Sequence, residues 1–114
     1  MVPVINRITL RSPDPSKLRR FYEGLGMSFD MKNRHYIIKL ANGLELSISM
    51  EPDLSPISDH FRLGLVVDNV TKRIMNLRMA DLGEIIKAAY QGPIGAYAKL
   101  KDPDGHVIIL TEGR

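Results

Sequence analysis

The chain contains no cysteine and no tryptophan among its 114 residues. The absence of cysteine excludes disulfide bonds, thiolate metal sites and cysteine nucleophiles, and it fits a protein of the cytoplasm. No apolar run reaches the ~20 residues of a membrane-spanning helix, so we expect no membrane partner. The first residues lack a basic region followed by a long apolar one, which argues against a signal peptide.

Acidic residues are also few, 13 against 16 basic ones, and the formal net charge is +3. The basic residues are scattered, and no long run of like charges occurs. A nucleic-acid-binding surface gathers basic residues beside exposed aromatic ones, whereas this chain has three Phe and four Tyr. We therefore expect no nucleic-acid partner.

The sequence consists of two similar halves. Residues 7–11 and 62–66 both begin with arginine, and each run leads through an aspartate into a helix-like segment. Strand-like segments then follow in each half, so we predict one βαβββ unit written twice. The prediction is a single domain over 1–114, with module one at about 4–50, a linker at 51–59 and module two at about 60–112.

Periodicity, capping residues and turn residues predict the individual elements. The expected helices follow Asp14-Pro15, with Gly26 as a left-handed cap, and follow Asp68 or Asn69, with Gly83 after the end. The expected strands are 4–11, 27–31, 35–40, 44–49, 62–67, 84–89, 96–101 and 106–112, with a loop at 91–95 and a tight turn at 102–105.

Each first strand has a leucine-bearing face and an arginine-bearing face. A helix can cover one face of a strand, and we expect it to cover the leucines. The opposite faces, with Arg7 and Arg62, are then free to line a cleft if the sheet curves.

Three segments resemble the vicinal oxygen chelate superfamily, which comprises glyoxalases, bleomycin resistance proteins and extradiol dioxygenases. They are Leu-Arg-Arg-Phe-Tyr-Glu-Gly-Leu-Gly at 18–26, Leu-Val-Val-Asp at 65–68 and Asp-Pro-Asp-Gly-His-Val-Ile-Ile-Leu at 102–110. The resemblance implies an α+β fold of two tandem βαβββ modules, which form a curved mixed sheet around a cavity with helices on the outer face. It also implies a homodimer, because short members are usually dimeric.

Metal-dependent members hold a divalent ion at four cavity positions, and by register these are Arg7, Glu45, Arg62 and Ile109. An arginine guanidinium stays protonated and offers no lone pair, and isoleucine has no donor atom. We therefore expect no metal and no cofactor. His60 could reach a ligand position after a register slip of two residues.

Each candidate site residue has more than one interpretation. Arg7 and Arg62 could clamp an anion, pair with Glu45 in a structural ion network, or lie at a solvent-wet rim. Glu45 is the candidate catalytic base, if there is one, or else the ion partner of an arginine. Thr9, Ser47, Tyr97 and Lys99 could donate hydrogen bonds to a ligand or form an ordinary wetted face, and His106 is expected to be exposed.

The sequence thus leaves three functions open. The preferred one is a metal-free protein that binds a small polar or anionic molecule, without catalysis. The first alternative is a metal-dependent lyase, isomerase or dioxygenase of the same superfamily. The second is a structural dimerising module with a vestigial cavity.

Overall fold

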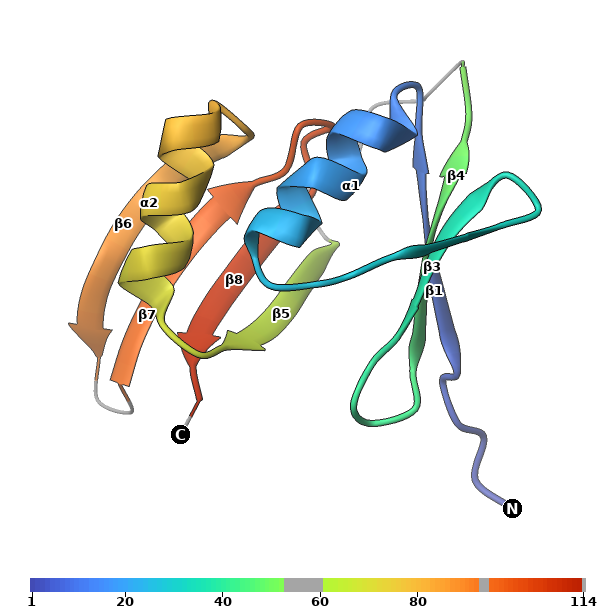
Figure 1. The fold of residues 1–114 in the computed structure, drawn as a ribbon. Helices are drawn as coiled ribbons and strands as arrows, with labels where there is room; N and C mark the ends of the chain where they lie inside the picture. Colours follow the sequence, from blue (N-terminus) through green and yellow to red (C-terminus); the bar gives the residue numbers. More distant parts are fainter. Residues whose placement is uncertain (53–60, 93–94, 114) are drawn as a thin grey trace.

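The computed structural model describes residues 1–52, 61–92 and 95–113, and for residues 89–92 and 95 it describes the backbone. Two units of the same order follow each other along the chain (Figure 1). The first contains β1 (Arg7–Ser12), α1 (Pro15–Gly24), β2 (Asp30–Lys32), β3 (His35–Lys39) and β4 (Glu45–Met50). The second contains β5 (Arg62–Val67), α2 (Val70–Ala80), β6 (Glu84–Gly92), β7 (Gly95–Lys101) and β8 (Val107–Glu112).

The two four-stranded sheets have the same topology. Their strand orders are β1-β4-β3-β2 and β5-β8-β7-β6. In each sheet the first strand pairs in parallel with the last strand of its module, and the other pairs are antiparallel. The predicted α+β class and duplicated βαβββ units are therefore confirmed. Through the described backbone, each sheet is hydrogen-bonded within its own module.

Helix α1 begins as the sequence predicts. The Asp14 side chain accepts a hydrogen bond from the Lys17 backbone N–H at 3.2 Å, and Pro15 is the first helical residue. The helix ends at Gly24, and the predicted left-handed conformation follows at Gly26, whose φ is 106°. Glycine takes this conformation without a steric penalty, and here it turns the chain towards β2.

The cap of helix α2 is Asn69, which settles the choice between Asp68 and Asn69. The Asn69 side chain accepts from the Lys72 N–H at 3.0 Å. Asp68 instead binds the Arg73 guanidinium through both carboxylate oxygens, at 2.9 and 3.1 Å. The hydrogen bond from Arg73 is the main reason that the pKa of Asp68 lies below its ordinary value.

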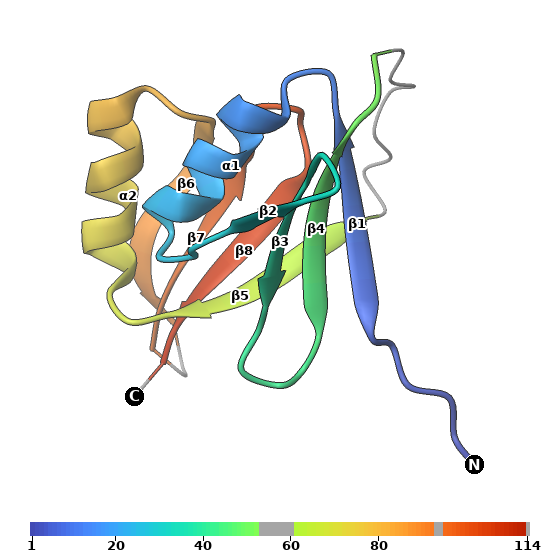
Figure 2. The same cartoon turned by 45° about the vertical axis from the view of Figure 1, so that its right-hand side comes forward.

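The leucine-bearing faces form one core shared by both modules. Leu10 and Leu46 from the first sheet join Leu63 and Leu110 from the second in a single apolar cluster. Figures 1 and 2 show α1 between α2 and the first sheet, and α2 over the second sheet. The helices therefore cover the leucine faces, as expected.

Several predicted boundaries were wrong by a few residues. The first strand starts at Arg7 rather than residue 4, and β2 starts at Asp30 rather than residue 27. In the predicted loop at 91–95, residues 91, 92 and 95 belong to strands, because Gln91 pairs with Ala96 and Gly92 pairs with Gly95; residues 93 and 94 lie outside the described residues. Most of the predicted linker lies outside the described residues. Within the described part of the chain, no helix is long and apolar enough to cross a membrane.

Candidate functional site

The outer face of the first sheet brings four predicted site residues together. In the parallel register of β1 and β4, Arg7 lies opposite Glu45 and Thr9 lies opposite Ser47. Arg7 Nε and Glu45 Oε2 are 2.6 Å apart, and the Thr9 and Ser47 hydroxyl oxygens are 3.0 Å apart. The Glu45 side chain is 22% exposed and that of Arg7 is 63% exposed. This geometry supports the ion-pair interpretation of Glu45.

A pocket of about 320 Å³ opens beside this ion pair. The β2–β3 hairpin forms its other wall, turning through Asn33 and Arg34 with φ of 50° and 66°. That turn places Lys32 and His35 on the pocket wall. Arg7, Lys32 and His35 therefore face a pocket in which Glu45 is the single carboxylate lining residue, and its charge is already matched by Arg7. Such a wall favours an anionic or polar ligand.

The other predicted residues lie on the outer face of the second sheet. Lys99 lies opposite Ile109, which in turn lies opposite Gly64, and Tyr97 lies two pairs further along, opposite Thr111. Arg62 lies opposite Val107 rather than Ile109. Arg62 is exposed, whereas Lys99 and Ile109 are half-buried. The second sheet thus presents cations beside an apolar strip, without a counterpart of the Arg7–Glu45 pair.

A single chain does not bring the two arginines to one site. The inner faces of both sheets contribute to one core, so the outer faces point away from that core. The pocket beside Arg7 is lined by residues of the first module alone. The candidate residues of one chain therefore form two separate groups, one on each outer face, which we call half-sites.

The residues present do not fit the divalent metal of the metal-dependent superfamily members. Of the four register positions, Glu45 alone is a ligand type, and its carboxylate is bound by a guanidinium. Over residues 1–52, 61–92 and 95–113, no three His, Asp or Glu side chains are grouped to hold an ion. His60 lies outside the described residues.

The expectation that His106 is exposed was wrong. His106 is buried at 7% exposure, and its Nδ1 lies 2.6 Å from Asp102 Oδ2. The Tyr22 hydroxyl donates to the same oxygen at 2.8 Å. Asp102 Oδ1 accepts from the backbone N–H of Asp104 and of His106. The turn sequence indicates these two backbone bonds, but it gives no sign that Tyr22 comes from the other module.

Burial dominates the electrostatics of this network. Burial raises the pKa of Tyr22 well above its ordinary value, and the Asp102 charge acts in the same direction. Burial also raises the pKa of Asp104, with Asp102 adding to it, while the Ser12 hydroxyl and His106 oppose the shift. The Tyr22–Asp102 bond of this network joins the two modules.

No model of a known protein family matches the sequence, and no curated protein matches it. Solved structures do match its fold. A glyoxalase-related enzyme from Fulvimarina pelagi is 22% identical, with a TM-score of 0.78 over 98% of this chain and 89% of that one. A glyoxalase/bleomycin resistance protein from Albidiferax ferrireducens T118 is 15% identical, with a TM-score of 0.75 over 96% and 98%.

A bleomycin resistance determinant encoded on the transposon Tn5 also matches. It is 22% identical, with a TM-score of 0.67, and the match covers 98% of this chain and 99% of that one. Both the duplicated topology and these structural neighbours lead to one conclusion. The chain has the fold of the vicinal oxygen chelate superfamily of glyoxalases, bleomycin resistance proteins and dioxygenases.

Proposed function

We propose that the protein is a metal-free homodimer that binds a small anionic or polar molecule. The ligand lies between the outer face of the first sheet of one copy and the outer face of the second sheet of the other. The observation that carries this proposal is the pocket beside Arg7. There, the cations Arg7 and Lys32 outnumber the one carboxylate on the wall, Glu45, and the His35 ring adds a polar group. Lys99 and Arg62 give the second half-site the same sign of charge.

The two half-sites require a second copy to face each other. Both outer faces point away from the core of their own chain. A two-fold axis can place the first sheet of one copy opposite the second sheet of the other, and it forms two equal cavities at once. Each cavity then receives Arg7 from one copy and Arg62 from the other, which corresponds to the anion clamp, one of the three interpretations of these arginines from the sequence.

A binding function fits the geometry of Glu45 better than catalysis does. A general base must be free to accept a proton from the substrate, whereas Glu45 is bound to Arg7 at 2.6 Å. In the proposed site Glu45 orients the Arg7 guanidinium. Thr9 and Ser47, which share a hydrogen bond, then provide polar contacts to the ligand.

Isothermal titration calorimetry with malonate and with inorganic phosphate tests the proposal. We expect at least one of these anions to bind the unaltered protein, and Arg7→Gln and Arg62→Gln each to weaken that binding by about tenfold or more. Arg20→Gln is the matched control, because Arg20 is an exposed arginine on α1, away from the pocket. No binding by the unaltered protein, or an affinity that neither Arg7→Gln nor Arg62→Gln changes, would reject the clamp.

Metal analysis separates this proposal from a metal-dependent enzyme. After dialysis, we expect Zn, Ni, Fe and Mn well below one ion per chain. A stoichiometric transition metal that survives dialysis would show that donors outside the described residues, such as His60, complete a site.

A further inference from the structure

The outer faces of the two sheets differ at equivalent positions of the two modules. Alignment of the first strands makes Gly64 the equivalent of Thr9, and the strand registers place Ser47 opposite Thr9 and Ile109 opposite Gly64. In the first module the two hydroxyl oxygens are 3.0 Å apart. In the second module a glycine and a half-buried isoleucine take their places. A hydrogen-bonding pair on one wall is therefore an open, apolar surface on the other.

Neither the backbone nor the packing of the described chain requires glycine at position 64. Gly64 lies inside β5, and its φ is not positive. A Cβ atom added there would meet no atom of the described residues within 4 Å. Glycine weakens the interior of a strand, and it often marks a place where a ligand or another backbone approaches closely. Gly64 therefore points to a group that approaches β5 from outside.

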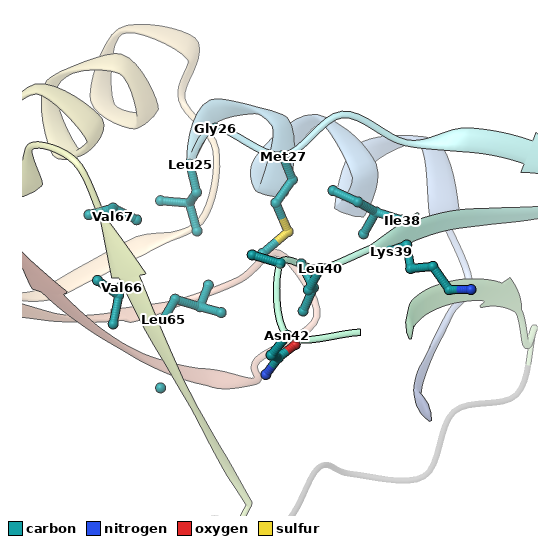
Figure 3. Close-up of a pocket in the computed structure, with 12 residues that line it drawn as sticks. Leu25, Gly26, Met27, Ile38, Lys39, Leu40, Asn42, Leu65, Val66 and Val67 are labelled. Atoms are coloured by element: carbon teal, nitrogen blue, oxygen red, sulfur yellow. The ribbon is translucent and has the colours of Figure 1, made fainter. Parts of the chain in front are cut away.

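Gly64 belongs to the outer face of β5 and not to its core-facing side. Figure 3 shows Leu65 and Val66 on opposite sides of the strand, with Leu65 directed into an apolar groove that Leu40 also lines. Side chains alternate along a strand, so Gly64 shares the side of Val66, which is 74% exposed. At Gly64 the surface of this face is the backbone itself, and it is flat.

Cations lie around this flat surface in the proposed dimer. Lys99 is half-buried and lies opposite Ile109 across the β7–β8 pair. The facing wall, from the first sheet of the other copy, carries Arg7 and Lys32 at the pocket. A ligand in this cavity therefore meets positive charge on one wall and an apolar plane on the other. Such a site selects a molecule that has both an acidic group and an apolar body.

We propose that the ligand is a small aromatic anion, with its acidic group at Arg7 and Lys32 and its ring flat against Gly64 beside Ile109. This inference rests on the proposed function and narrows its ligand class. A purely polar anion leaves the Gly64–Ile109 surface in contact with water, whereas a ring covers it. Gly64 then determines specificity, because a side chain at this position would occupy the space of the ring.

Titration calorimetry with two phosphate monoesters tests the inference, because methyl phosphate and phenyl phosphate share an acidic group and differ in the ring. We expect the unaltered protein to bind phenyl phosphate about tenfold or more tightly than methyl phosphate. Gly64→Val should largely abolish this preference, and Gly64→Ala, whose methyl group enters open space, should reduce it. Ala88→Val is the matched control and should keep the preference, because Ala88 is exposed on β6, at the opposite edge of the same sheet.

The outcomes distinguish this inference from the proposed function. If neither ester binds the unaltered protein, the anion site is rejected and the inference with it. If both esters bind equally, and Arg7→Gln weakens both, the anion site stands and the aromatic ligand is overturned. An undiminished preference in Gly64→Val and Gly64→Ala also overturns it. Sedimentation equilibrium checks the remaining case, since a Gly64→Ala protein that folds but no longer dimerises would show that a protein backbone, and not a ligand, approaches Gly64.

Discussion

Tyr22 on α1 donates a hydrogen bond of 2.8 Å to Asp102, which lies just after β7 in the other module. The bond is buried, and the two residues are 80 positions apart in the sequence. It is therefore a direct polar link between modules that otherwise share an apolar core.

Replacement of Tyr22 by Phe removes this link without changing the shape of the ring. Asp102 is 3% exposed and keeps its bonds to His106 and to two backbone N–H groups. We expect the free energy of unfolding to fall by about 2 kcal/mol, because one acceptor site on a buried carboxylate loses its donor. Urea denaturation at pH 7 measures the change. Tyr36→Phe is the control, and an equal loss there would show that the hydroxyl contact is not responsible.

The His106 ring is the other side-chain partner of Asp102 Oδ2. We expect His106→Leu to destabilise the fold by about 1–3 kcal/mol, since it leaves Asp102 Oδ2 with one donor fewer. His106→Asn should recover part of the loss, because an amide N–H can donate from a similar position. Thermal unfolding of the two variants checks that His106→Asn is more stable than His106→Leu. A leucine variant as stable as the asparagine variant would mean that His106 acts by packing alone.

Asp104 should destabilise the fold as its carboxyl group ionises. Its pKa is raised in the folded state, mainly by burial, so the folded protein holds the proton more tightly than the unfolded chain does. The unfolded chain therefore loses this proton first as the pH rises above 3.8, and the folded state loses stability until the raised pKa is passed.

We accordingly expect Asp104→Asn to be more stable than the unaltered protein at pH 7. The difference should shrink as the pH falls through this window and vanish where the carboxyl group is protonated in both states. Urea denaturation from pH 3 to pH 7 measures the difference in the free energy of unfolding between the variant and the unaltered protein. A variant that loses stability at neutral pH would show that the charge of Asp104 makes a favourable contact.

Gly83 shows how closely module one packs against module two. Its φ is 72°, and a Cβ atom there would lie 2.5 Å from the Lys101 carbonyl oxygen and 2.6 Å from Phe21 Cε2. Gly105 also has a positive φ, 97°, but an added Cβ would meet nothing within 4 Å. We expect Gly105→Ala to cost about 1 kcal/mol through backbone strain alone.

Gly83→Ala should cost about 2 kcal/mol more than Gly105→Ala, because overpacking adds to the strain. Chemical denaturation of both variants isolates the contact, since the backbone penalty is common to them. Equal costs would indicate that Phe21 and the Lys101 backbone move aside easily.

Local patterns predicted most of the secondary structure. The capping of α1 by Asp14 and Pro15, the alternation in β4 and β5, and the tight turn at 102–105 each depend on interactions between near neighbours. The ends of β6 and β7 were missed because Gln91 and Gly92 suggest a loop, whereas pairing with β7 extends the strand. Cross-strand hydrogen bonds outweigh a weak local preference.

The sequence by itself determined the duplicated modules and the burial of the leucine faces, because periodicity and capping are local properties of the chain. Tertiary structure decided which residues meet. It paired Arg7 with Glu45, set Val107 rather than Ile109 opposite Arg62, buried His106 and linked Tyr22 to Asp102. These contacts depend on strand register and on the packing of one module against the other, and neither is encoded in the spacing of residues along a single segment.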